Sequence, residues 1–324
     1  MAEKFTVSAS PHVRSPKTSQ GIMLDVIIAL VPSLIASIII FGFRSLLVTV
    51  VCVAVCVASE YLTRKILKRN NTIGDLSAIV TGMLLAFNLP VSIPLWMAAI
   101  GCVAAIVVVK QFFGGIGQNF VNPAIAGRII LLVSFPSYMS TWTKAMSWRT
   151  DALTTATPLA SLGNGDTSGL PSLTDMLLGL RGGCLGETCI IALVIGFIWL
   201  LVRGIVKPTI PLCFIGTVAV IMLIAGKGDL EFAAYELLSG GLFLGAIFMA
   251  TDYTTSPITT KGKIIFAVGC GVITSVIRLY GSLPEGVSYS IIIMNILTPL
   301  IDRYTLHKPF GYVKEKKQKE DKAA

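Results

Sequence analysis

The chain has 324 residues, of which 54% are hydrophobic and only 13% charged, and its mean hydropathy is +0.80. A water-soluble domain cannot hide that much apolar surface, so the composition predicts a membrane protein. The formal net charge is +9, but the basic residues flank apolar runs or gather near the end of the chain, which argues against nucleic acid as a partner. With two histidines in all, we expect no metal site built by the protein.

Five of the seven cysteines fall inside apolar runs, where cysteine packs as a small hydrophobe. The other two, Cys184 and Cys189, lie near the end of the longest polar segment. They could form a disulfide, but the sequence favours two unpaired thiols.

The first 20 residues are polar and lack an apolar core, so we expect no cleavable signal and assign residues 1–21 to an N-terminal segment. Ten stretches then follow that are long and apolar enough to be membrane spans. Their approximate ranges are 22–42, 45–61, 74–90, 93–111, 120–135, 187–202, 209–226, 232–251, 262–280 and 286–302. The predicted fold class is therefore an all-α polytopic membrane protein with about ten transmembrane helices.

The two halves of the chain resemble each other. A glycine-rich segment, 114–127, opens the fifth stretch, and residues 281–299 lead into the tenth in a similar way. We therefore predict a five-helix repeat at 22–135 and a second at 187–302, with a loop at 136–186 between them and a basic tail at 303–324. Five is an odd number, so such repeats would be inverted in the membrane. Chance similarity between glycine-rich segments is the alternative.

Basic residues predict the orientation. With both termini in the cytoplasm, twenty Lys and Arg fall on the inner side and six on the outer side. The inner set is Lys4, Arg14, Lys17, Arg64, Lys65, Lys68, Arg69, Lys110, Arg128, Arg203, Lys207, Lys261, Lys263, Arg303, Lys308, Lys314, Lys316, Lys317, Lys319 and Lys322; the outer set is Arg44, Lys144, Arg149, Arg181, Lys227 and Arg278. Because positive charge accumulates on the cytoplasmic side, the 136–186 loop is expected to be extracytoplasmic.

Acidic residues at the ends of the stretches have structural interpretations. Glu60 is expected to reach the membrane interface. Asp75, three residues after Thr72, is expected to cap the third helix together with it. Asp252 and Asp302 end two stretches on the inner side, where we expect them to pair with nearby lysines.

Asparagines inside the membrane are harder to explain by packing alone. Asn122-Pro123 frees backbone groups near the start of the fifth stretch, and irregular backbone at membrane depth is tolerated where it lines a cavity or is covered by protein. Asn119, Asn122, Asn295 and Asp252 are therefore candidates for a cavity that holds a flavin or passes an ion. Hydrogen bonding between helices is the equally weighted alternative.

The long loop carries one pattern that indicates chemistry. It contains no histidine and no phosphate-binding glycine motif, which disfavours hydrolysis and nucleotide binding. Residues Asp151-x-x-Thr154-x-Ala156-Thr157 resemble the flavinylation motif Asp-x-x-Ser/Thr-Gly-Ala-Thr of membrane redox complexes, with Thr155 in place of the usual glycine. By that match Thr157 is the attachment residue, and Asp151, Thr154 and Ala156 are recognition positions. The alternative is a merely polar, threonine-rich loop.

Further stretches extend the resemblance over residues 8 to about 310. They are Ser8-Ala-Ser-Pro-His12-Val-Arg, Gly114-Gly-Ile-Gly-Gln-Asn-Phe-Val-Asn-Pro-Ala124, Gly245-Ala-Ile-Phe-Met-Ala-Thr-Asp-Tyr-Thr-Thr-Ser-Pro257 and Leu283-Pro-Glu-Gly-Val-Ser-Tyr289. Together they resemble the RnfD proteins of Rnf complexes. The nearest relatives of that family are the NqrB proteins of the sodium-pumping NADH:quinone oxidoreductases, with inverted repeats like those of urea channels.

The resemblance implies a subunit of a ferredoxin:NAD oxidoreductase in the bacterial cytoplasmic membrane, with no complete reaction of its own. A flavin transferase would attach FMN to Thr157 as a phosphoester, and a second, non-covalent flavin is a further candidate cofactor. The implied partners are Rnf subunits A, B, C, E and G, above all the flavin-bearing G subunit, and the transported ion would be Na⁺ or H⁺. A solute channel or transporter with an incidental threonine loop is the rival function.

Overall fold

The structure is a computed structural model, and it describes residues 18–149, 157–163, 170–281 and 285–306. Every regular element in these residues is helical, which confirms the predicted all-α class. Within the described ranges, three helices are long and apolar enough to cross a membrane: α1 (Ser19–Phe41), α2 (Phe43–Ile66) and α13 (Thr260–Tyr280). A fourth span arises if α11 (Leu230–Leu238) is taken together with Leu242–Met249, at a bend of 63°.

The other expected stretches also contain helices, but most of these are short. They are α3 (Ser77–Phe87), α4 (Leu95–Val103) continued by the π-helical η2 (Ala104–Gln111), α5 (Pro123–Ser134), α9 (Ile190–Val202), α10 (Thr209–Ala225), α12 (Leu242–Leu244) continued by the π-helical η4 (Gly245–Met249), and α14 (Val287–Thr305). The 11 residues of α3 span roughly 17 Å at 1.5 Å per residue, against about 30 Å of bilayer core. The count of ten spans therefore stays a prediction.

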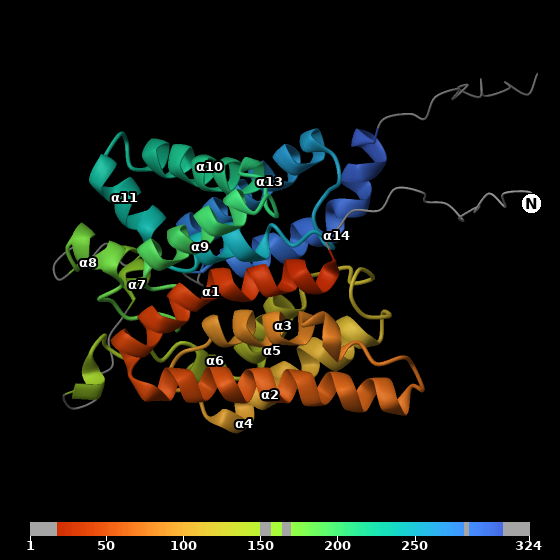
Figure 1. Ribbon diagram of the computed structural model, residues 1–324. Coiled ribbons are helices and arrows are strands. Elements are labelled where there is room, and N and C mark those ends of the chain that lie inside the picture. The colour runs from red at the N-terminus through yellow and green to blue at the C-terminus, as the bar shows by residue number, and fades with distance from the viewer. Residues whose placement is uncertain (1–17, 150–156, 164–169, 282–284, 307–324) are drawn as a thin grey trace, which may run out of the picture.

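The helices form two groups (Figure 1). In the first helix group, coloured red to yellow, α2 packs against α3 and α4. In the second helix group, coloured green to blue, α10 packs against α11 and α13. The groups meet where α1 packs against α9 and α5 against α14. At the first junction a Cβ on Gly196 would lie 2.2 Å from the carbonyl oxygen of Ala29, so the close approach requires glycine there.

A single residue joins α1 to α2. Gly42 has φ 78, in the left-handed region that glycine tolerates best. A Cβ there would lie 2.9 Å from Cγ of Trp148, whose Nε1 donates to the Ile39 carbonyl at 3.2 Å. The first part of the long loop is thereby anchored on the α1–α2 turn.

The described part of the long loop contains four short helices: α6 (Pro136–Met139), the 3-10 helix η3 (Ser147–Arg149), α7 (Pro158–Gly163) and α8 (Leu173–Leu178). α8 packs against α9 and α11, and α7 packs against α11. The latter part of the loop therefore lies against the second helix group, at the left of Figure 1.

Candidate functional site

Thr157 directly precedes α7 and is buried, with 9% of its surface exposed. It lines a small pocket of about 280 Å³, opening included. The other described residues of this pocket are Trp142, Pro158, Leu159, Gly182, Glu187, Gly240 and Glu285. The predicted recognition positions Asp151, Thr154 and Ala156 lie outside the described residues.

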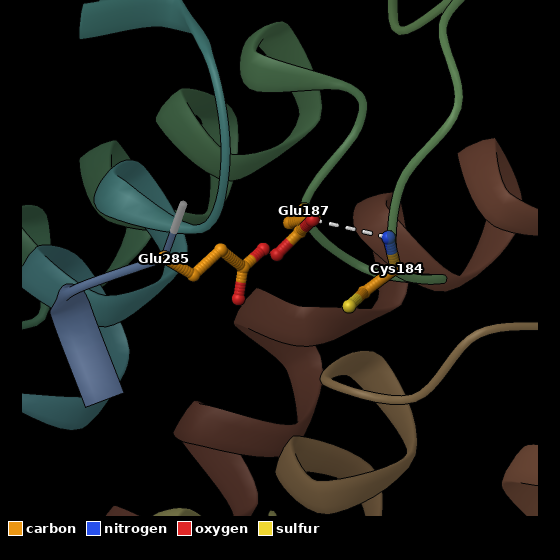
Figure 2. Close-up of side chains that lie close together, drawn as sticks. All are labelled: Cys184, Glu187 and Glu285. Atoms are coloured by element: carbon orange, nitrogen blue, oxygen red, sulfur yellow. Dashed lines mark hydrogen bonds between the residues drawn. The ribbon is translucent and has the colours of Figure 1, made fainter. Parts of the chain in front are cut away.

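Two carboxylates face each other beside this pocket (Figure 2). Oε1 of Glu187 accepts a hydrogen bond from the Cys184 backbone N–H at 3.1 Å. Its Oε2 is buried without a hydrogen-bond partner in the described part of the chain, although the residue is only 3% exposed. Glu285, which lies just before α14, forms an ion pair with Arg128.

Arg128 connects the carboxylates to the first helix group. From α5, its Nη1 donates to Oδ1 of Asn88 at 2.6 Å, and its Nη2 contacts both Glu285 and Sγ of Cys184, the latter at 3.7 Å. Arg128 was expected on the inner side and the loop on the outer side. Arg128 contacts Cys184 at the end of the loop and Glu285, which lines the pocket of Thr157, so these two expectations do not hold together.

Cys184, Glu187 and Glu285 bring ligand atoms within 4.8 Å of one another, a spacing that could serve a metal ion. However, the Arg128 guanidinium already contacts two of the three and supplies positive charge there. Burial raises the pKa of the Cys184 thiol, the opposite of what a thiolate ligand needs. Arg181 lies beside the group and donates to the Glu187 carbonyl at 3.1 Å; burial lowers the pKa of Arg181 to about 10, so it stays charged at neutral pH.

A second cavity lies between the two helix groups and has a volume of about 820 Å³, opening included. It brings together three of the four predicted cavity residues, Asn119, Asn122 and Asp252. Lys110 of η2 and Phe248 of η4 also line it, so both π-helical segments contribute. Such segments are rare and occur frequently at functional sites.

Asn122 explains how the chain opens α5. Its Oδ1 accepts from the N–H groups of Ala124 and Ile125 at 3.0 and 3.4 Å, which makes it the N-cap. Its Nδ2 donates to the Met249 carbonyl in the other helix group at 3.3 Å. Asn122 thus lines the cavity and also hydrogen-bonds between helices, so both sequence interpretations apply to it.

The other candidates differ in their surroundings. Oδ1 of Asn119 is buried without a partner among the described residues. Asn295 does not line the cavity; in the amide orientation that satisfies both atoms, it donates to the Thr255 carbonyl and accepts from the Asn122 N–H. Asp252 accepts from the N–H and hydroxyl of Thr254 at 3.2 and 3.0 Å. Neither Asp252 nor Asp302 forms an ion pair with a described lysine, and Lys308 lies outside the described residues. Asp302 accepts a hydrogen bond from the Ile258 N–H.

A buried ion pair beside the cavity was missed from the sequence. Nζ of Lys110 lies 2.7 Å from Oε2 of Glu60, and Glu60 is fully buried, not at the interface as expected. Nζ also donates to Oγ of Ser77, and the Thr72 hydroxyl donates to Glu60 instead of capping α3. Leu76 is the N-cap of α3, and Asp75, one residue before it, accepts from the Ser77 N–H at 2.8 Å, so the carboxylate satisfies one free N–H group of the helix start as expected. One signal was available: Cys52, Cys56 and Glu60 recur every four residues, so Glu60 continues a buried stripe of α2.

All seven cysteines are free thiols, which confirms the favoured interpretation of Cys184 and Cys189.

Comparison with known proteins extends over both helix groups and the loop. The model of the NQR2, RnfD, RnfE family matches residues 6–311. The chain is 48% identical over 316 residues to the D subunit of the Na(+)-translocating ferredoxin:NAD(+) oxidoreductase complex of Acetobacterium woodii, covering 97% of this chain and 98% of that protein. It is 42% identical over 321 residues to the D subunit of the proton-translocating ferredoxin:NAD(+) oxidoreductase complex of Clostridium ljungdahlii, covering 95% and 96%. The D subunit of the ion-translocating oxidoreductase complex of Stutzerimonas stutzeri is 36% identical over 326 residues, with 90% and 91% covered.

Proposed function

The chain belongs to the NQR2, RnfD, RnfE family, and on that premise we propose that it is the membrane-embedded D subunit of an ion-translocating ferredoxin:NAD oxidoreductase complex. The observation that carries the proposal is the similarity along nearly the whole chain to subunits of that name. The two named relatives translocate different ions, Na⁺ and H⁺, so their names leave the ion of this complex open. Its partners would be the Rnf subunits A, B, C, E and G, with the G subunit nearest to the flavin loop.

The proposed cofactor is FMN, attached to Thr157 as a phosphoester by a flavin transferase. A phosphoester needs only a hydroxyl, which Thr157 offers at the end of the motif that begins at Asp151. FMN would supply the electron-carrying chemistry, and the protein its position. The hydroxyl fits this role, whereas the pocket around it fits neither a phosphate nor a flavin ring, because it is small and lined by Glu187 and Glu285.

For the membrane arrangement we propose ten spans in two inverted repeats. The packing of the helices supports the repeats. In the first helix group α2 packs against α3 and α4, and in the second group α10 packs against α11 and α13 in the corresponding order. Both termini would be cytoplasmic and the loop extracytoplasmic. With Arg128 on the side of the loop, nineteen basic residues remain inside and seven outside, which still favours this orientation.

The cavity between the helix groups is the proposed site for a second, non-covalent flavin or for a passing ion. The unpartnered Oδ1 of Asn119 is an acceptor that a ligand could satisfy.

In-gel flavin fluorescence tests this function against the rival, a solute channel or transporter. The chain is purified from cells that contain the flavin transferase and run on a denaturing gel. We expect fluorescence at the mass of the chain, and none in a Thr157→Val variant that still inserts into the membrane. A dark band for the parent chain would favour the rival, and a fluorescent Thr157→Val band would show that another residue carries the flavin.

A further inference from the structure

The threonine that would receive FMN is docked against residues distant in the sequence. Thr157 is 9% exposed and Leu159, two residues later, is 3% exposed. Leu159 packs on the turn between α11 and α12, where its Cδ2 lies 3.4 Å from the Cβ position of Gly240. The start of α7 therefore holds Thr157 inside the protein.

Covalent transfer cannot take place on a threonine in this position. In the reaction, Oγ1 of Thr157 forms a bond to the phosphorus of the FMN moiety of FAD, the anhydride bond of FAD breaks, AMP leaves, and the hydroxyl proton is released. A transferase must reach Oγ1 with its own active site, so the start of α7 has to leave the pocket for the reaction.

Volume opposes the return of the modified residue. The pocket has about 280 Å³ with its opening included. Sites for drug-sized ligands begin at roughly 300 Å³ and extend to about 1,000 Å³. A riboflavin phosphate linked to Thr157 belongs to that size class and would have to displace the walls.

Charge also opposes the return of the modified Thr157 to the pocket. A phosphodiester is an anion, and the described residues that line the pocket include two carboxylates, Glu187 and Glu285, and no basic residue. Arg128 pairs with Glu285, and Arg181 donates to the backbone carbonyl of Glu187. The carboxylate oxygen of the pocket that has no hydrogen-bond partner among the described residues is Oε2 of Glu187, so a phosphodiester would meet this oxygen. Like charges in a poorly solvated site repel strongly.

We propose that the start of α7 docks only while Thr157 is unmodified, and that FMN attachment keeps residues 157–159 out of the pocket. The small volume of the pocket and the unpartnered carboxylate oxygen of Glu187 then distinguish the two forms by excluding the phosphoester. The released segment presents the flavin at the surface, where a partner subunit can exchange electrons with it. This inference rests on the proposed flavinylation of Thr157.

The test measures the accessibility of position 159. A Leu159→Cys variant is purified with its complex, once with FMN attached and once from cells that lack the flavin transferase. Both samples react with a water-soluble maleimide, and the labelled peptide is quantified by mass spectrometry. We expect at least tenfold faster labelling of the flavin-bearing form. Thr174→Cys, exposed on α8, should label equally fast in both forms, and Met176→Cys, buried on α8, should stay protected in both.

Hydrogen exchange over residues 157–163 repeats the comparison with the native Leu159. Equal protection with and without attached FMN, in either measurement, would overturn the inference and show that the pocket accommodates the phosphoester, for example by drawing Arg128 away from Glu285. A peptide that lacks the flavin mass although the transferase is present would instead overturn the proposed function, and the inference with it.

Charge and volume are separated by two further variants in the Leu159→Cys background. Thr157→Glu introduces an anion without a flavin, and Thr157→Gln is its neutral match. We expect Thr157→Glu to label severalfold faster than Thr157→Gln. Equal rates would overturn the role assigned to the charge of Glu187.

Discussion

Replacing Lys110 by methionine removes one partner of the buried pair with Glu60. The two charged atoms lie 2.7 Å apart, and the side chains are 2% and 0% exposed. In the variant, the Glu60 carboxylate stays buried with the Thr72 hydroxyl as its remaining donor. Removing one partner of such a pair costs about 3–5 kcal/mol, because the other charge is left uncompensated. We therefore expect Lys110→Met to lower the free energy of unfolding by about 4 kcal/mol.

The assay is unfolding of the purified chain from mild detergent by increasing SDS, followed by circular dichroism. Two controls define the mechanism. The double variant Glu60→Gln/Lys110→Met removes both charges and keeps an acceptor for Thr72, so it should lie within about 1 kcal/mol of the parent. Lys207→Met removes an exposed lysine and should change stability by less than about 0.5 kcal/mol. A double variant as unstable as Lys110→Met alone would refute the reasoning.

Three other predictions concern packing, the Arg128 pair and the thiol. Gly196→Ala should destabilise the chain by about 1–3 kcal/mol in the same assay, because its Cβ would meet the Ala29 carbonyl oxygen at 2.2 Å. The control Gly216→Ala has open space around the new Cβ and should be neutral or slightly stabilising. Equal effects of the two variants on stability would contradict the close packing of α1 against α9. Arg128→Met should lower the free energy of unfolding by about 2 kcal/mol, less than the loss of a fully buried pair, since Glu285 is 18% exposed. Adding Glu285→Gln to this variant should recover part of the lost stability. No recovery would show that the two residues do not interact. Cys184 should resist maleimide in native membranes and react only after denaturation. The thiol is buried, and its raised pKa keeps the reactive thiolate scarce. Labelling of the native protein at the rate of an exposed cysteine would contradict the burial of Cys184.

The sequence predicts the helices well and the buried charges poorly. Apolar runs and local signals, such as Asn122-Pro123 at the start of α5, depend on neighbouring residues, and each expected stretch contains a helix. The partner of Glu60 lies 50 residues away and that of Arg128 lies 157 residues away. Because burial of a charge depends on such distant contacts, the flanking sequence of Glu60 and of Arg128 does not predict their partners.

The candidate sites show the same limit. Asn119, Asn122 and Asp252 were predicted to share a cavity, and the structure brings them together from both helix groups. Asn295 joins them only through a hydrogen bond to the Asn122 backbone. At Thr157 the motif suggests the chemistry, but no local pattern predicts that Glu187 and Glu285 line its pocket, since one follows the loop and the other precedes α14.

The central claim is that Thr157 carries FMN, and the mass of one peptide tests it most directly. Trypsin cleavage after Arg149 and Arg181 isolates residues 150–181, which contain no other lysine or arginine. For the chain purified from cells with the flavin transferase, we predict this peptide at its own mass plus FMN less one water, with fragment ions that assign the addition to Thr157. The unmodified mass alone, or an addition on Thr154 or Thr155, would contradict the claim.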